Sequence, residues 1–313
     1  MKELLAKWGS KFGRADTQPL VDGVWRCCLG DEAYILKRRS NRTRALEEYD
    51  LLKWLSEHEQ PVSLLLHTKE GVPWAEYQGS FFVLYPYLPG IPGDTLVTRS
   101  HSWASEAGST LARLHRCLAD YDAHTGFPGF DLFHEVSTYA WPVAQSYSSE
   151  KLHHRLHELG QTISEQLVNP YEALPRQLIH RDFHPGNLVF RDEKVAGILD
   201  FDRVRIGIRV FDLCYLATSV LSSTFSDLGR REEWPSFVQE LIRGYAREMP
   251  LGKTEGHVFL YITYLIQLLF VAYHLDAGDT KRADGDLAIL FWLYDQQEYL
   301  QPLIDKTVTE VKE

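Results

Sequence analysis

The stretch from His180 to Asp200 contains side chains whose types and spacing suit a divalent cation and a proton acceptor. Asn187 immediately precedes a predicted strand over 188–190, and Asp200 immediately follows a second predicted strand over 195–199. An antiparallel hairpin brings its two open ends together, so the amide of Asn187 and the carboxylate of Asp200 are expected to converge. Such oxygen ligands suit Mg²⁺ held together with water and phosphate groups.

Asp182 lies in the same stretch, on a loop that contains Pro185 and Gly186 and leads to Asn187. Its carboxylate is expected to face the same point without joining the strand, where it can orient a hydroxyl group and accept its proton. Phosphoryl transfer needs little more from a protein than in-line positioning, a metal ion that neutralises phosphate charge, and one residue on the nucleophile. The pattern therefore predicts phosphoryl transfer with Asp182 as the base.

The sequence HRDFHPGN at 180–187, followed by ILDFD at 198–202, resembles the aminoglycoside phosphotransferase and choline kinase group of protein-kinase-like small-molecule kinases. The resemblance implies an enzyme that moves the γ-phosphoryl group of ATP to a hydroxyl of a small molecule, such as an aminoglycoside-, choline- or homoserine-like alcohol. It implies Mg²⁺ as cofactor, with Asn187 and Asp200 as ligands and Asp182 as the catalytic residue.

The resemblance extends towards the N-terminus, where it implies an ATP-binding pair. Lys37 matches the strand lysine that contacts the α- and β-phosphates, and Glu48 matches the helix glutamate that pairs with this lysine. The adjacent Glu47 is an alternative partner. Glu48 is preferred because Leu52 and Leu55 follow it on the same helix face, which is expected to pack inward.

The segment from Ser80 to Gly90 resembles the strand and hinge that meet adenine in this group. The resemblance implies that backbone groups of Tyr85 and Tyr87 bind the edge of the base, although plain core packing would explain these aromatic residues equally well. Asp202 stands where the related DFG motif has glycine. This departure leaves open whether Asp202 is a further carboxylate that contacts the metal.

Two further residues of the resemblance are interpreted as structural. Asp212 is expected to cap a helix and to brace the catalytic loop. His115, in the LARLH sequence at 111–115, matches a helix position of the same group and is also interpreted as structural.

The order of predicted elements gives an α+β fold of two lobes, and the resemblance implies that this bilobal fold is protein-kinase-like. A β-rich N-terminal lobe over 1–88 is expected to bind the nucleotide, and a mainly helical lobe over 89–313 is expected to carry catalysis and the acceptor. The elements expected from periodicity and turn residues are strands at 20–29, 33–37 and 80–84, a helix from about 43 that ends before Pro61, and helices at 103–118 and 151–168.

Two other functions are compatible with parts of the sequence. A protein Ser/Thr kinase would need an activation segment closed by an APE-type motif, but the chain after Asp202 runs quickly into the helix expected at Asp212. A non-catalytic nucleotide-binding protein, as in spore-coat relatives of these kinases, would have no physical need for Lys37, Asp182 and the two metal ligands together.

Composition and charge limit the class of protein and the compartment in which it is expected. The 313 residues have a formal net charge of −10, which argues against a general nucleic-acid binder. The N-terminus lacks the apolar region of a signal peptide, and four cysteines without a CxxC pair suit free thiols in the cytoplasm. The apolar segment 258–273 is shorter than a membrane span and is predicted to be a buried core helix. The oligomeric state is not indicated.

Overall fold

The structure is a computed structural model that describes residues 1–97, 102–122, 126–147 and 150–310. The chain forms two compact units. The first comprises Met1–Ile91 and Leu188–Asp202, and the second comprises Pro92–Asn187 and Arg203–Glu313. Each unit is described by itself below. The assignment of nucleotide binding to residues 1–88, and of catalysis and acceptor binding to residues 89–313, stays a prediction.

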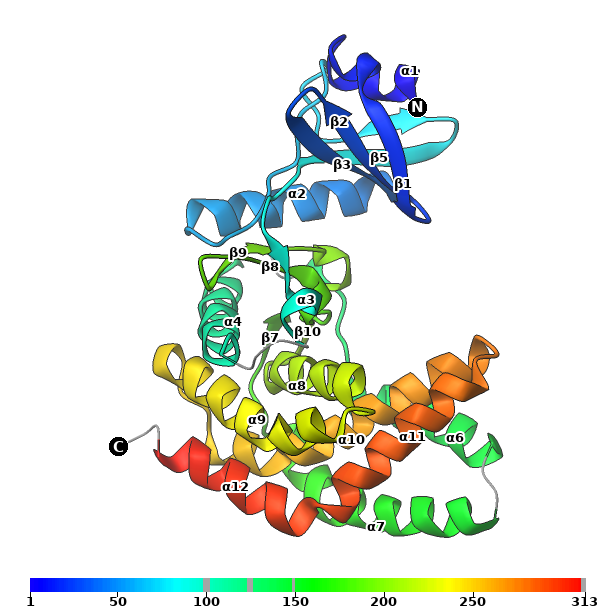
Figure 1. Cartoon of the computed structure of the whole chain (residues 1–313), viewed down its shortest axis with the longest axis vertical. Helices are drawn as coiled ribbons and strands as arrows, with labels where there is room; N and C mark the ends of the chain where they lie inside the picture. The colour runs from blue at the N-terminus through cyan, green and yellow to red at the C-terminus, as the bar shows by residue number, and fades with distance from the viewer. Residues whose placement is uncertain (98–101, 123–125, 148–149, 311–313) are drawn as a thin grey trace. The chain divides into compact units, whose positions relative to one another are not determined.

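The first unit is built on a five-stranded antiparallel sheet with the order β1-β2-β3-β5-β4 (Figure 1). The predicted strand at 20–29 is wrong in one respect, because a turn at Asp22 and Gly23 divides this region between two strands. Gly23 has a φ of 75°, a conformation that glycine adopts without strain. The strands of the sheet are β1 (Asp16–Val21), β2 (Val24–Leu29), β3 (Glu32–Arg39), β4 (Ala75–Tyr77) and β5 (Ser80–Pro86).

Helix α2 (Arg42–Glu57) begins after Asn41, whose side chain accepts a hydrogen bond from the backbone N–H of Arg44 at 3.0 Å. Its buried face includes Glu48, as predicted from the leucine spacing. Three short helices pack with the sheet residues into an apolar cluster. These helices are α1 (Lys2–Leu5), η1 (Ala6–Trp8) and η2 (Phe12–Arg14).

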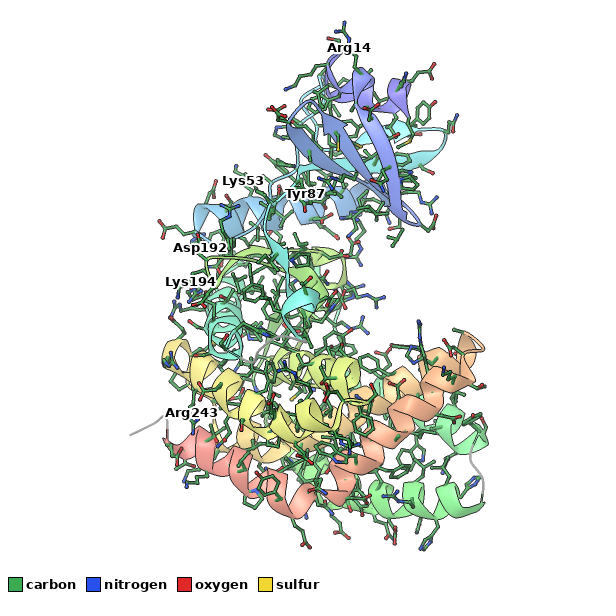
Figure 2. The ribbon with its side chains drawn as sticks, in the orientation of Figure 1. Arg14, Lys53, Tyr87, Asp192, Lys194 and Arg243 are labelled. Carbon is green, nitrogen blue, oxygen red and sulfur yellow. The ribbon has the colours of Figure 1, made fainter. Side chains whose placement is uncertain are left out.

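The predicted hairpin between Asn187 and Asp200 is confirmed, as strands β8 (Leu188–Arg191) and β9 (Lys194–Ile198). Its two-residue turn places Asp192 and Glu193 at φ values of 50° and 62°, the left-handed pair that a type I′ turn requires. Asp192 and the first residue of β9, Lys194, are labelled in Figure 2. Leu188 lies opposite Ile198 in this ladder. The chain passes to the second unit at β6 (Ile91–Pro92).

The second unit is mainly helical (Figure 1). It also contains a two-stranded antiparallel sheet of β7 (Arg176–Ile179) and β10 (Arg205–Ile208), which the sequence did not predict. The helices are α3 (Gly93–Val97), α4 (Ala104–Ala119), α5 (Leu132–Glu135), the π-helical turn η4 (Val136–Ala140), α6 (Trp141–Tyr147), α7 (Glu150–Glu172), η5 (Pro185–Asn187), α8 (Val210–Thr224), α9 (Leu228–Glu248), α10 (Lys253–Asp276), α11 (Thr280–Asp295) and α12 (Gln297–Glu310); a further turn, η6, spans Phe201–Arg203.

Helix α10 is the core helix of the second unit and contacts α8, α11 and α12. Within the described ranges it is the one helix with the length and apolar character of a membrane span. Of its most apolar 18-residue stretch, 78% is buried inside the structure. Its polar residues Thr263 and Gln267 are buried as well. The prediction of a buried core helix over 258–273 is therefore confirmed.

Helices α4 and α9 approach each other closely at two glycines. A Cβ atom on Gly108 would lie 2.1 Å from the carbonyl oxygen of Leu241, and one on Gly244 would lie 2.0 Å from that of Ser105. Only glycine permits this approach. The approach matters for the site, because α4 carries His115 and α9 carries Tyr245, which are hydrogen-bonded to each other at 2.8 Å.

Candidate active site

The loop from His180 to Asn187 is held by Asp212, which lies in the first turn of α8 and is completely buried. Asp212 accepts hydrogen bonds from the backbone N–H groups of His180 at 2.7 Å and Arg181 at 2.8 Å. Its carboxylate also lies 2.9 Å from Nε2 of the buried His115. The predicted brace and the structural role of His115 are confirmed. The predicted helix cap is wrong, because the N-cap of α8 is Arg209 and the Asp212 oxygens face the loop instead.

Arg181 has a φ of 63°, which is unusual for a residue with a side chain. Its side chain is fixed at two points. The guanidinium group donates to Glu135 at 3.1 Å and lies 3.9 Å from the centre of the Phe130 ring. Glu135 in turn accepts a hydrogen bond from Tyr273 at 2.7 Å. These contacts hold the left-handed turn that directs the next residue, Asp182.

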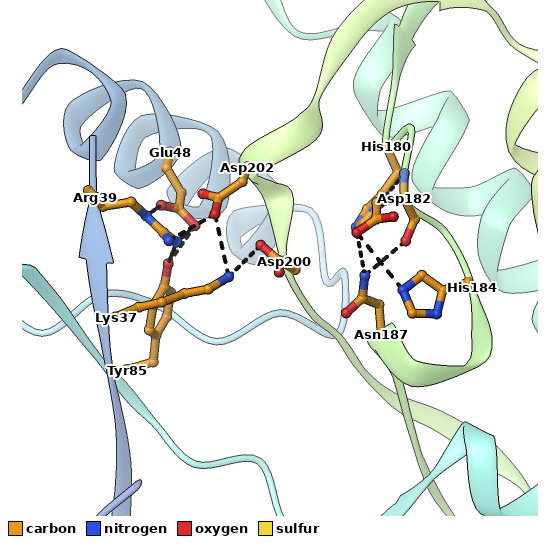
Figure 3. Close-up of polar contacts among 10 residues, drawn as sticks. All are labelled: Lys37, Arg39, Glu48, Tyr85, His180, Asp182, His184, Asn187, Asp200 and Asp202. Carbon is orange, nitrogen blue, oxygen red and sulfur yellow. Dashed lines mark hydrogen bonds and ion pairs between the residues drawn. The ribbon is translucent and has the colours of Figure 1, made fainter. Parts of the chain in front are cut away.

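Both carboxylate oxygens of Asp182 are hydrogen-bonded. Nδ2 of Asn187 donates to Oδ2 at 3.0 Å and to the backbone carbonyl of Asp182 at 2.9 Å (Figure 3). The hydroxyl of Tyr215 donates to Oδ1 at 3.1 Å, and Nε2 of His184 lies 3.9 Å from Oδ2. Because the amide nitrogen of Asn187 is turned to Asp182, its amide oxygen is the atom that can bind a cation.

In the first unit, Lys37 binds the two aspartates that follow the hairpin (Figure 3). Its Nζ lies 2.5 Å from Oδ1 of Asp200 and 3.5 Å from Oδ2 of Asp202. Burial acts against ionisation of Asp200, but the combined attraction of Lys37 and Arg39 lowers the pKa of this carboxyl below its usual value. Asp200 is therefore held as an anion that can serve as a metal ligand.

The expected ion pair between Lys37 and Glu48 is not formed in the described structure. Glu48 is instead bound by Arg39, whose Nε and Nη2 each lie 2.8 Å from one of its carboxylate oxygens. The Tyr85 hydroxyl donates to Glu48 at 2.5 Å. The physical reason is geometric, because the planar guanidinium group binds a carboxylate through two parallel hydrogen bonds and an ammonium group cannot. Glu47 pairs with Arg44 at 3.0 Å, so it is not the partner of Lys37 either.

Arg39 links this pair to the segment after the hairpin. Its Nη1 lies 2.9 Å from Oδ2 of Asp202, and the Arg39 and Glu48 side chains are only 4% and 6% exposed. Partial burial raises the pKa of Asp202 to about 6, against the opposing attraction of Arg39 and Lys37. Arg39 was not predicted from the sequence as a partner of Glu48. The available signal was its spacing, because residues two apart in a strand share one face and Lys37 and Arg39 are such a pair.

The backbone groups predicted to bind adenine are in part occupied by the sheet. The N–H of Tyr87 donates to the carbonyl of Ala33 at 2.9 Å, and Tyr85 lies opposite Ile35 in the same ladder. Because hydrogen-bonded pairs alternate along an antiparallel ladder, the backbone groups of both tyrosines face β3. Adenine binding by Tyr85 and Tyr87 stays a prediction. The carbonyl of Pro86, which lies between them, points to the opposite edge of β5, where it accepts a hydrogen bond from Ser63.

The side chain of Tyr85 is hydrogen-bonded to Glu48 and Arg39. It donates to Glu48 and accepts a hydrogen bond from Nη2 of Arg39 at 2.5 Å. Burial, followed by the charge of Glu48, raises the pKa of Tyr85 well above its usual value, so the hydroxyl is a permanent donor. Tyr85 thus belongs to the buried cluster of Arg39, Glu48 and Asp202.

The two groups of side chains, at Asp182 and at Lys37, are joined in the chain by the hairpin. Asn187 comes one residue before Leu188, and Asp200 comes two residues after Ile198, which is the partner of Leu188. Asn187 has an amide oxygen and Asp200 a carboxylate oxygen, and both are hard ligands of the kind that Mg²⁺ takes. A carboxylate held for a hydroxyl, a lysine suited to phosphate, and these ligands are the parts that phosphoryl transfer requires.

Known proteins resemble the chain in sequence over most of this region. The model of the phosphotransferase enzyme family matches residues 23–254. A homoserine kinase from Phenylobacterium zucineum is 25% identical over 216 residues, which are 66% of this chain and 60% of that protein. The chain therefore spans less than two thirds of the length of this relative.

Solved structures resemble the chain in fold. An aminoglycoside phosphotransferase from Alicyclobacillus acidocaldarius superposes with a TM-score of 0.72 at 15% identity, covering 100% of this chain and 96% of that one. A microcompartment-associated aminopropanol kinase superposes with a TM-score of 0.71 at 17% identity, covering 96% and 98%. These similarities confirm the predicted α+β, protein-kinase-like fold.

Proposed function

Because the chain belongs to the phosphotransferase enzyme family, we propose that it transfers the γ-phosphoryl group of ATP to a hydroxyl group of a small molecule. The observation that carries this proposal is the Asp182 carboxylate, whose two oxygens are held by Asn187 and Tyr215 on a loop braced by Asp212. A carboxylate fixed in this way can orient a hydroxyl group and accept its proton.

In the proposed reaction, Asp182 binds the acceptor hydroxyl and takes its proton as the hydroxyl oxygen attacks the γ-phosphorus. The bond between the γ-phosphorus and the bridging oxygen breaks, and ADP leaves with the electron pair of that bond. Mg²⁺ would neutralise charge on the phosphates when bound, and the amide oxygen of Asn187 with a carboxylate oxygen of Asp200 would hold it.

We assign Lys37 to the phosphates of ATP. Its side chain is 17% exposed, and its ammonium group is paired with Asp200 at 2.5 Å and can exchange this partner for a phosphate oxygen. We do not assign Asp202 to the metal. Because Arg39 and Lys37 both bind it, we propose that Asp202 fixes the segment after β9. Glu48 would then support the nucleotide site through Arg39 and not through Lys37.

For the base of the nucleotide, we propose the carbonyl of Pro86 and the N–H of Leu88. The backbone groups of Tyr85 and Tyr87 face β3. Those of Pro86 and Leu88, which alternate with them, are therefore expected to point to the opposite edge of β5. The Pro86 carbonyl accepts a hydrogen bond from Ser63 at 2.9 Å and has a second lone pair for a ligand.

The acceptor is proposed to be a small alcohol, and homoserine and aminopropanols are the first compounds to test. Similarity to a homoserine kinase and to an aminopropanol kinase supports this order. A protein acceptor is disfavoured, because only β10 and short connections separate Asp202 from the start of α8 at Val210. We place the enzyme in the cytoplasm, in keeping with four cysteines that are all free thiols.

The proposed function is tested by ADP release from Mg·ATP against a panel of amino alcohols, choline, sugars and aminoglycosides. We expect one class of acceptor to stimulate ADP release and to gain a phosphate by mass spectrometry. A generic protein substrate belongs in the same panel. Phosphorylation of that protein alone, with every small molecule inert, would favour a protein kinase over the proposed function.

Replacing Lys37 by Ala should weaken ATP binding by roughly 10- to 100-fold, because the charge-assisted hydrogen bond from the lysine to a phosphate oxygen is lost. The dissociation constant of Mg·ATP, measured by calorimetry, checks this value. Arg38→Ala is the matched control, since Arg38 lies next in the strand and pairs with the exposed Asp22 at 2.8 Å. Equal ATP affinity in Lys37→Ala and Arg38→Ala would remove Lys37 from the nucleotide site.

A further inference from the structure

Tyr215 is a partly buried residue on α8 whose hydroxyl donates to Oδ1 of Asp182 at 3.1 Å. It lies three residues after Asp212, so one helix face carries both the brace of the catalytic loop and this hydroxyl. We propose that Tyr215 is a positioning residue that fixes the plane of the Asp182 carboxylate for proton transfer. This inference rests on the proposed function, in which Asp182 is the base.

The ring of Tyr215 is placed by its aromatic neighbours. It stacks on Phe211 with ring centres 5.5 Å apart and an interplanar angle of 22°, and it meets Phe270 edge-on at 5.7 Å. Phenylalanine would make the same ring contacts. Packing therefore accounts for an aromatic residue at this position, but it does not account for the hydroxyl.

The hydroxyl of Tyr215 is partly buried, and in the described structure its hydrogen-bond partner is Asp182. Burial, followed by the negative charge of Asp182, raises the pKa of the Tyr215 hydroxyl above its usual value. The hydroxyl is therefore protonated at physiological pH and always donates. It acts as a fixed donor that does not compete for the proton of the acceptor.

The hydrogen bond matters because the terminal torsion of an aspartate is soft and roughly two-fold. Asn187 alone holds Oδ2 and leaves Oδ1 free to swing. With Tyr215 bound to Oδ1, the carboxylate is held at both oxygens, and each oxygen keeps a second lone pair. One of these lone pairs then has a fixed direction from which to accept the proton, which is what an efficient base requires.

The test compares three variants by steady-state kinetics with the acceptor found in the panel. In Tyr215→Phe, kcat should fall roughly 10- to 100-fold, because one hydrogen bond to a charged group is lost. The KM values for Mg·ATP and for the acceptor should stay within about twofold, since the lost contact orients the base and binds neither substrate. Replacement of Tyr215 by 4-aminophenylalanine restores an N–H donor at the same place and should recover most of kcat.

Tyr171→Phe is the matched control, because Tyr171 is another tyrosine of the second unit whose hydroxyl donates to a carboxylate, that of Asp131, at 3.1 Å. Its kcat should equal that of the wild type. Wild-type kcat in Tyr215→Phe, or a loss that 4-aminophenylalanine does not recover, would overturn the role of Tyr215 alone. A wild-type protein without turnover on any acceptor would overturn this inference and the proposed function together.

Discussion

Asp182→Asn should lower kcat by about 100- to 10,000-fold, the range that general-base catalysis contributes. Asparagine has nearly the shape of aspartate and can still accept a hydrogen bond from Tyr215 or Asn187. It cannot accept the proton of the attacking hydroxyl. The loss should therefore appear in kcat, and the dissociation constant of Mg·ATP should change little.

The measurement is the steady-state rate of ADP formation at saturating Mg·ATP and acceptor. Asp192→Asn serves as the matched control, because it removes the same charge at the hairpin turn, where a φ of 50° suits asparagine. Turnover by Asp182→Asn at the rate of this control would show that Asp182 is not the base. The brace by Asp212 would then position the loop for another purpose.

Arg39→Met should lower the free energy of unfolding by about 3–5 kcal/mol, the typical cost of removing one partner of a buried ion pair. Arg39 and Glu48 are 4% and 6% exposed, so methionine would leave a buried carboxylate without its cation. Asp202 would lose a partner at 2.9 Å in the same change. Arg39→Met/Glu48→Gln should recover part of the loss, because it removes the unpaired charge.

Urea denaturation followed by circular dichroism gives these free energies. Arg38→Met is the control, since Arg38 and Asp22 are 46% and 91% exposed and such a surface pair contributes at most about 1 kcal/mol. Two results would count against the buried cluster: a single variant as stable as the wild type, or a double variant no more stable than the single one.

The catalytic loop and the hairpin could be predicted because their residues are contiguous. Asn187 and Asp200 flank two short strands, and a two-residue turn at Asp192 and Glu193 closes them. Local pairing of this kind depends on few long-range contacts. The brace by Asp212 came from resemblance to a family, and the structure adds its two backbone donors on His180 and Arg181.

The partner of Glu48 could not be predicted, because Lys37 and Arg39 lie on the same face of one strand. Their Cα atoms are only about 6.6 Å apart along the strand. Which of them meets Glu48 depends on how far α2 is shifted along β3, and side-chain patterns do not record that shift. The edge of β5 that the backbone groups of Tyr85 and Tyr87 face could not be predicted for a related reason, since a one-residue slip exchanges the two edges of a strand.

The helix face of Tyr215 could be predicted from the sequence, but its hydrogen bond to Asp182 could not. It lies three residues after Asp212, so both are expected on one face of a helix. Its hydrogen bond to Asp182 joins residues that are 33 positions apart. The strands β7 and β10 were missed because each has four residues, and their pairing joins segments on either side of the hairpin.

The central claim is that this chain transfers phosphate from ATP to a small alcohol with Asp182 as base. The most direct measurement follows radiolabelled γ-phosphate from ATP into the panel compounds, with and without Mg²⁺, for the wild type and Asp182→Asn. We expect a labelled small molecule that forms only with Mg²⁺ and only with the wild type. Label that stays in ATP or appears solely as inorganic phosphate with every acceptor would contradict it.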